Sequence, residues 1–129
     1  MTEFMLLTHG DWGTSLLESA RMIVGNIHGV HIFPLYPEDA LADYTEKIRD
    51  VLDKEDGRQI LMISDLNGGT TSNVAAVFSR TYENVSAVCG LGMEMLIAAS
   101  ELREELEGKE LAKAVLSWTA EKNRDLECD

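Results

Sequence analysis

The chain lacks most features that mark secreted, fibrous or membrane-spanning proteins. Its two cysteines, Cys89 and Cys128, form neither a disulfide framework nor a metal-ligand spacing. Only two prolines occur, and no low-complexity tract, which excludes a disordered or fibrous class. No apolar run reaches membrane-spanning length, and residues 1–4 lack the basic start of a signal peptide. We therefore expect a cytoplasmic protein with one domain over residues 1–129, without a linker or a second domain.

Positive charge is also scarce. Eleven lysines and arginines stand against 23 aspartates and glutamates, so the formal net charge is -12. Such a chain is repelled by nucleic-acid backbones and by anionic lipid surfaces. We expect no nucleic-acid partner and only indirect contact with a membrane. A protein partner with a basic or neutral face fits the charge better.

Apolar runs and amphipathic stripes alternate along the chain. The runs predict strands at residues 4–8, 30–35, 60–63 and 85–91. Apolar residues at helical spacing predict a helix after each strand, the first with a Ser15–Glu18 capping box and the second starting at Pro37. A fourth helix follows from Met93, and a last one covers residues 111–118. This alternation predicts an α/β, doubly wound fold: a mainly parallel sheet of four or five strands with helices on both faces.

A flavodoxin-like strand order, 2-1-3-4, brings two distant turns together. In this order the first and third strands are neighbours, and ligands bind where their carboxyl ends meet. His9 follows the first strand and precedes Gly10, whereas Asp65 follows the third strand. We therefore predict that His9 and Asp65 lie side by side as a catalytic pair.

The turn after Asp65 has the composition of an anion site. Two glycines let the main chain approach a ligand, and the amides at the following helix N-terminus bind phosphate without a cation. We predict that phosphate is bound by the residues of this turn, which are Gly68, Gly69, Thr70, Thr71 and Ser72. Capping of the helix by Thr70 or Ser72 is compatible with this role.

Histidine and aspartate at such a site indicate phosphoryl transfer. An imidazole attacks phosphorus only from an unprotonated nitrogen, and Asp65 is suited to accept the proton of the other nitrogen of His9. This chemistry needs no metal and no cofactor. The chain lacks a nucleotide-binding G-x-x-x-x-G-K-[ST] motif and has no lysine near the glycine turn, which favours a protein over ATP as phosphoryl donor.

The two turns resemble the motifs of a known family, the enzyme IIA components of the mannose family of the sugar phosphotransferase system. The matching motifs are Thr8-His9-Gly10 and Asp65-Leu66-x-Gly68-Gly69-Thr70, with Asn73. The resemblance implies a phosphocarrier: His9 accepts the group from HPr and passes it to a IIB component, with Asp65 as the active-site aspartate. It also implies a homodimer. This chain departs from the family at Thr71, where proline is common, and places Asp11 close to His9.

Two hydrophobic residues are predicted to contact a partner. Trp12 lies just beyond the first turn, although it would equally cover the first helix. Met93 lies near the end of the fourth strand, where core or dimer packing is the alternative. His28 and His31 flank the second strand without a carboxylate pattern nearby, so we expect them to be surface or edge residues.

Other functions remain compatible with the sequence. The phosphocarrier subunit of dihydroxyacetone kinase shares the early histidine turn. A regulatory module controlled by phosphorylation of His9 uses the same chemistry for a different purpose. A metal-dependent hydrolase would use His9, Asp11 and Asp65. A flavin or dinucleotide binder follows from fold analogy alone.

Overall fold

The computed structural model describes residues 1–128. Strands and helices alternate as the apolar pattern predicted. The elements are β1 (Glu3–His9), α1 (Trp12–Val24), β2 (Val30–Leu35), α2 (Leu41–Lys54), β3 (Ile60–Ser64), α3 (Thr70–Thr81), β4 (Val85–Cys89), α4 (Met93–Leu102), α5 (Gly108–Lys122) and the short 3-10 helix η1 (Leu126–Cys128).

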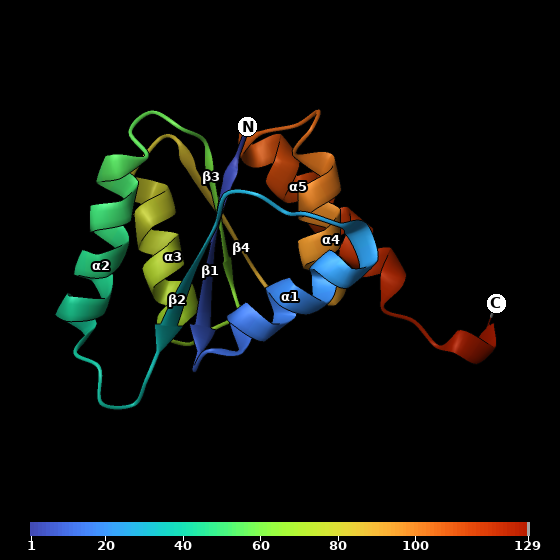
Figure 1. Ribbon diagram of the computed structural model, residues 1–129, viewed down its shortest axis with the longest axis horizontal. Helices are drawn as coiled ribbons and strands as arrows, with labels where there is room; N and C mark the ends of the chain where they lie inside the picture. Colours follow the sequence, from blue (N-terminus) through green and yellow to red (C-terminus); the bar gives the residue numbers. More distant parts are fainter. Residues whose placement is uncertain (129) are drawn as a thin grey trace.

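The four strands of the described residues form one parallel sheet in the order β2-β1-β3-β4. Helices α2 and α3 cover one face, and α1, α4 and α5 cover the other (Figure 1). The predicted α/β class and strand order are confirmed. Because β1 and β3 are neighbours, the loops that follow them meet at the carboxyl ends of the strands, where the strand order changes direction.

The core explains why the strands are apolar throughout. In β1, Phe4 and Leu6 pack toward α1, α4 and α5, whereas Met5 and Leu7 pack toward α2 and α3. All four side chains are fully buried. Each contributes about 1.5–3 kcal/mol through removal of its apolar surface from water. The central strands are therefore held from both sides, which gives the loops at their ends a fixed base.

The first helix starts earlier than the sequence pattern indicated. It begins at Trp12, with Asp11 at the N-cap position, so the predicted capping box of Ser15 and Glu18 is wrong. The hydroxyl of Thr14 donates to Asp11 Oδ1 at 2.8 Å, which ties the first turn together. Strand and helix are consequently joined by only two residues, and α1 starts directly beside the turn that carries His9.

The second helix starts later than predicted, at Leu41 rather than at Pro37. The intervening residues form a closed turn instead. The amide of Asp39 donates to the carbonyl of Tyr36 at 3.0 Å, and the amide of Tyr36 donates to Asp39 Oδ2 at 2.8 Å. These bonds close a turn over residues 36–39, and the helix begins only after it, with Ala40 at the N-cap position.

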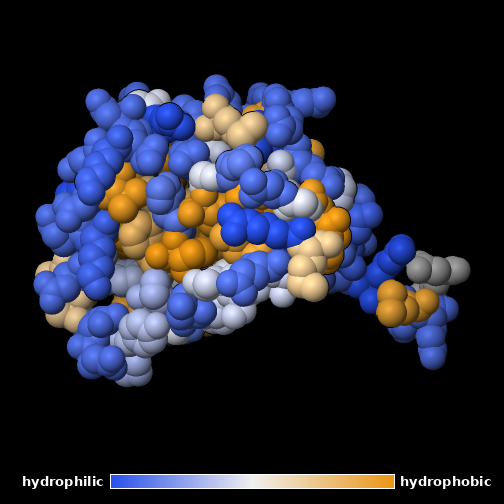
Figure 2. Space-filling model, viewed as in Figure 1, coloured by the Kyte–Doolittle hydropathy of each residue, from blue (hydrophilic) through white to orange (hydrophobic). Residues whose placement is uncertain are grey.

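The surface is largely hydrophilic at the periphery and over α2, while apolar atoms reach the surface in the middle of the view, between the two helical layers (Figure 2). Within residues 1–128, each helix is too short or too polar to cross a lipid bilayer.

Candidate active site

His9 and Asp65 lie at adjacent strand ends. His9 is the last residue of β1, and Asp65 follows the last residue of β3. The amide of Asp65 donates to the carbonyl of Leu7 at 3.1 Å, which continues the pairing between these strands past the end of β3. The predicted proximity of His9 and Asp65 is confirmed, because Asp65 Oδ2 lies 2.9 Å from His9 Nδ1.

The turn after β1 is fixed from two sides. Gly10 has a φ of 70°, a left-handed conformation that favours glycine. Its amide donates to the carbonyl of Leu35 at the end of β2, at 2.8 Å, and its carbonyl accepts the hydroxyl of Thr8 at 2.7 Å. The backbone around His9 is therefore positioned by both neighbouring strands, so the imidazole projects from a rigid base.

The carboxylate of Asp65 receives three donors. Its Oδ2 accepts the backbone amide of His9 at 2.6 Å as well as the ring nitrogen. Its Oδ1 accepts the hydroxyl of Thr71 at 2.8 Å. Burial by itself raises the pKa of this carboxyl, but the hydrogen bonds from His9 and Thr71 outweigh burial and lower the pKa below its ordinary value. Asp65 is therefore an anion at neutral pH.

This pairing sets the tautomer of the imidazole. An ionised carboxylate can only accept hydrogen bonds, so Nδ1 of His9 carries the proton that points at Asp65. The lone pair is then on Nε2. The Asp65 side chain is only 7% exposed, whereas that of His9 is 49% exposed. The site thus has a buried orienting group and an accessible nucleophilic nitrogen.

Gly69 leaves open space beside that nitrogen. A Cβ at this position would lie 3.4 Å from His9 Cε1 and 3.8 Å from Nε2. The φ of Gly69 is -105°, which any residue adopts. Neither the backbone conformation nor these ordinary contact distances excludes a side chain at this position, but a Cβ would occupy the space beside the imidazole. The loop therefore lies against the ring edge where a group bound to Nε2 would be placed.

The turn that the sequence predicts to bind phosphate differs from expectation in which donors it offers. Ser72 Oγ accepts the amides of Gly68 at 2.9 Å and Gly69 at 3.1 Å, and it donates to the carbonyl of Gly69. These two glycine amides are thus engaged within the loop. The buried hydroxyl of Thr71 is likewise engaged, with Asp65.

Donors remain at the start of α3. The first amides of an α-helix, here those of Thr70, Thr71 and Ser72, have no partner within the helix and carry the positive end of its dipole. The side chain of Thr70 is exposed to solvent. The loop and the helix N-terminus together form an anion-binding edge in which Ser72 holds the backbone and α3 supplies the donors.

The predicted contact residues lie in different environments. Trp12 is 38% exposed at the first position of α1, next to the histidine turn. Met93 begins α4 but is partly buried against the core on the α1, α4 and α5 face. The sequence analysis did not identify two exposed residues, Tyr36 and Leu66. Tyr36 directly follows β2, and Leu66 lies two residues after the end of β3. Their positions just after predicted strands were the available signal.

The acidic residue close to His9 plays a local role. Asp11 Oδ1 accepts the hydroxyl of Thr14 and is exposed. The imidazole is held by Asp65 instead. This arrangement does not form the three-ligand set of His9, Asp11 and Asp65 that a metal-dependent hydrolase would use.

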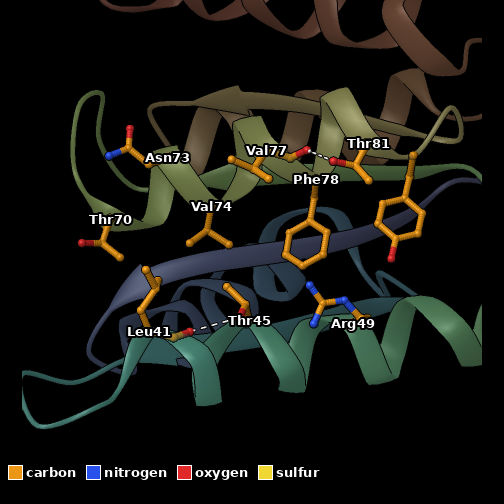
Figure 3. A pocket seen from close by; sticks show the side chains of 10 residues that line it. Leu41, Thr45, Arg49, Thr70, Asn73, Val74, Val77, Phe78 and Thr81 are labelled. Atoms are coloured by element: carbon orange, nitrogen blue, oxygen red, sulfur yellow. Dashed lines mark hydrogen bonds between the residues drawn. The ribbon is translucent and has the colours of Figure 1, made fainter.

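A groove of about 450 Å³ runs between α2 and α3, starting at Thr70 (Figure 3). Leu41 faces it from α2, and Val74 and Phe78 face it from α3. The guanidinium of Arg49 lies 5.7 Å from the ring centroid of Phe78. The lining does not include the histidine and aspartate pair, so the groove adjoins the site of the chemistry without containing it.

Several known proteins with similar sequences and folds are named as components of the phosphotransferase system. The family model described as "PTS system fructose IIA component" matches residues 3–116. The fructose-specific EIIA component of Bacillus subtilis (strain 168) is 29% identical over 112 residues, covering 86% of this chain and 77% of that protein.

Two solved structures share the fold over nearly their full length. The mannose/sorbose-specific IIA subunit from Enterococcus faecalis has a TM-score of 0.87 and 28% identity, covering 97% of this chain and 94% of that one. The phosphotransferase system component EIIA from Streptococcus agalactiae has a TM-score of 0.88 and 24% identity, with both chains covered completely. At that identity the second likeness concerns the fold alone. The family match includes both turns of the site.

Proposed function

We propose that His9 is the phosphoryl-carrying residue of this chain, which belongs to the fructose and mannose IIA family of the sugar phosphotransferase system. The family transfers phosphoryl groups from HPr to IIB components, which makes the chain a phosphotransferase component. The observation that carries the assignment to His9 is its contact with Asp65 at 2.9 Å, which leaves Nε2 unprotonated and accessible.

The proposed reaction is a displacement at phosphorus. The lone pair of His9 Nε2 forms a bond to the phosphorus of phosphohistidine on HPr. The phosphorus–nitrogen bond of the donor breaks, and its electron pair returns to the imidazole of HPr. In the second step a nucleophilic side chain of the IIB component attacks, and the electron pair of the broken bond returns to Nε2 of His9.

Asp65 supports both steps by its charge and position. Positive charge develops on the imidazole as the bond to phosphorus forms, and the carboxylate at Nδ1 stabilises that charge. Hydrogen bonds from the Thr71 hydroxyl and the His9 amide hold the carboxylate in position for this contact. Asp65 therefore acts through His9 and does not need to contact the phosphoryl group.

The anion-binding edge is proposed to hold the phosphoryl oxygens. The first amides of α3 and the hydroxyl of Thr70 supply donors, which are worth most when they are preorganised. Gly68 and Gly69 contribute shape: their amides bind Ser72 Oγ, which fixes the loop, and Gly69 leaves room beside Nε2.

Phosphorylation with purified components tests the assignment. Wild-type protein incubated with phosphoenolpyruvate, enzyme I and HPr is expected to take up label, and His9→Gln is expected to take up none. His28→Gln is the matched control, since His28 is an exposed histidine on the loop before β2. Label on folded His9→Gln protein would refute the role of His9.

The rim of the site is proposed to receive the partner proteins. Trp12, Tyr36 and Leu66 present exposed apolar surface at the edge where His9 lies, and aromatic residues concentrate binding energy at interfaces. Met93 is a weaker candidate because it is partly buried against the core. Trp12→Ala is expected to raise KM for phosphorylated HPr while leaving kcat within a few-fold, and an unchanged KM would exclude Trp12 from the interface.

The relatives' names favour the sugar system over the carrier of dihydroxyacetone kinase, since they denote sugar-specific components. We place the carrier in the cytoplasm, as a single domain over residues 1–129 that forms a homodimer. Within the described sheet, β2 and β4 are edge strands with one neighbour each, and such edges are available for association. A monomeric mass by light scattering at working concentration would refute the dimer.

A further inference from the structure

A second cluster of ionisable side chains lies at the amino ends of the strands, whereas His9 lies at the carboxyl end of β1. Glu3 is the first residue of β1, His31 is the second residue of β2, and Glu55 follows the last residue of α2. His31 Nε2 lies 3.3 Å from Glu3 Oε1 and 3.7 Å from Glu55 Oε1. His31 does lie on the edge strand β2, as expected, but the expectation that no carboxylate lies near it is wrong.

The fold explains why these three side chains converge. Glu3 and Met5 are two positions apart on β1 and point to one face of the sheet, and His31 pairs with Met5 in the register of β1 and β2. That face carries α2, whose end brings Glu55 over the strands. The Glu3 carboxylate is seated against the backbone of Gly29, where a Cβ would collide with it.

Each carboxylate presents one oxygen to His31 and the other to Arg58. Arg58 Nε lies 3.4 Å from Glu55 Oε2, and Arg58 Nη1 lies 3.8 Å from Glu3 Oε2. The two Oε1 atoms remain on the side of the imidazole nitrogen. Arg58, whose side chain is 60% exposed, thus forms ion pairs with the second oxygen of each carboxylate and leaves the first to His31.

We propose that Glu3, His31 and Glu55 form a binding site for a divalent transition-metal ion, with Zn²⁺ as the best-fitting ion. The three ligand atoms, His31 Nε2 and an oxygen from each carboxylate, all lie within 4.8 Å of one another. Tetrahedral zinc with bonds of about 2.0–2.1 Å places its ligand atoms roughly 3.3 Å apart. The 3.3 Å separation matches this value, the 3.7 Å separation needs a shift of a few tenths of an ångström, and the separation between the two carboxylate oxygens, which is at most 4.8 Å, would close by rotation of the glutamate side chains.

The chemistry of the ligands selects the class of ion. An imidazole nitrogen with two carboxylate oxygens suits zinc and its transition-metal neighbours, whereas calcium and magnesium prefer oxygen ligands alone. The side chains of Glu3, His31 and Glu55 are 14%, 29% and 21% exposed, so the site is partly shielded but open to water at a fourth position. The positive ion would offset the negative charge of the Glu3 and Glu55 carboxylates in a chain of net charge -12.

Such an ion would connect the start of β1, the start of β2 and the end of α2. Glu3 and His9 are at opposite ends of β1, which places the site about 20 Å from the phosphoryl carrier. The ion therefore contributes to stability and takes no part in phosphoryl transfer. For the same reason, the metal site can fail experimentally while the proposed function stands, and the reverse.

Metal binding is measured on the full chain after removal of metal with a chelator. Isothermal titration with Zn²⁺ is expected to give one site per chain and a higher melting temperature for wild-type protein. Co²⁺, as a spectroscopic substitute, is expected to give the intense visible absorption of tetrahedral coordination. His31→Gln is expected to weaken Zn²⁺ binding at least tenfold, and His28→Gln, which changes a histidine outside the cluster, is expected to leave it unchanged.

Two results would overturn the proposal. Equal Zn²⁺ affinity of wild-type and His31→Gln protein would show that the metal binds elsewhere, as an adventitious ion only. No binding at micromolar Zn²⁺ would show that the cluster is an ion-pair network and not a metal site. If His31→Gln fails to fold, Glu55→Gln provides the same test from the end of α2, with retained phosphorylation of His9 as the check on its fold.

Discussion

The replacement Asp65→Asn separates the charge of the carboxylate from its role in orienting the imidazole. Asparagine has one oxygen that accepts and one amide group that donates. With its oxygen in the place of Oδ2, it still accepts the amide and Nδ1–H of His9, and its NH₂ faces the hydroxyl of Thr71, which can turn to accept. The opposite orientation would set a donor against the amide of His9. Asp65→Asn is therefore expected to keep the tautomer and lose the charge.

The magnitude follows from the hydrogen bond at 2.9 Å between Nδ1 and the carboxylate. A hydrogen bond with a charged partner contributes about 1.5–3 kcal/mol and one between neutral groups about 0.5–1.5 kcal/mol. As the ring gains positive charge in the transition state, the carboxylate supplies stabilisation that a neutral amide oxygen does not match. Taking that gain as the difference of about 1–2 kcal/mol between the two classes of hydrogen bond gives a rate of phosphorylation about 5- to 30-fold lower for Asp65→Asn. Asp65→Ala also loses orientation of the ring, so we expect a loss of about 100-fold or more.

The assay is quenched-flow phosphorylation by phosphorylated HPr, with urea unfolding to confirm that each variant is folded. Asp11→Asn is the matched control, because it removes an acidic charge close to His9 and keeps an oxygen that accepts from Thr14. We expect its rate to stay within a few-fold of wild type. A wild-type rate for folded Asp65→Ala would refute the reasoning, and an Asp65→Asn rate as low as that of Asp65→Ala would refute the retained tautomer.

Three further predictions follow from the same geometry. Gly69→Ala is expected to fold at wild-type stability and to slow phosphoryl transfer, because its Cβ would lie 3.4 Å from His9 Cε1; Gly92→Ala, in open space at the start of α4, is the control that keeps its rate. Thr71→Val removes a donor to Asp65 and is expected to cost about 1–2 kcal/mol of unfolding free energy by urea denaturation, with a several-fold lower rate; no loss of stability would contradict the contact. Because the pKa of Asp65 is lowered in the folded protein, the stabilisation by its carboxylate is present above the ordinary pKa of 3.8 and is lost as pH falls through the lowered value. The difference in unfolding free energy between wild type and Asp65→Asn should therefore narrow in that pH range. A constant difference would argue against the lowered pKa.

Much of the fold was predictable because the strands share one feature, an apolar run without polar alternation. The run of residues 4–7 is apolar without alternation, which only burial on both faces explains, and the same holds for residues 60–63. Because the strands are parallel and the first and third are neighbours, His9 and Asp65 must lie close together at the carboxyl ends of these strands. The proximity of this pair therefore followed from topology and needed no knowledge of side-chain contacts.

Details that depend on short side-chain contacts were not predictable in this way. The helix starts at Trp12 and Leu41 are accompanied by local bonds of Asp11 and Asp39 that the spacing of apolar residues does not reveal. The engagement of the Gly68 and Gly69 amides by Ser72 depends on one rotamer. Residues far apart in sequence, such as Glu3, His31 and Glu55, have no shared spacing that reveals their convergence.

The central claim is that Nε2 of His9, left unprotonated by Asp65, carries the phosphoryl group. The most direct test is nitrogen-15 NMR of histidine-labelled protein, recorded before and after phosphorylation by phosphoenolpyruvate, enzyme I and HPr. The account predicts one phosphorylated imidazole, that of His9, with phosphorus coupled to Nε2 and the proton retained on Nδ1. Phosphorus coupled to Nδ1 of His9, or to a nitrogen of His28 or His31, would contradict it.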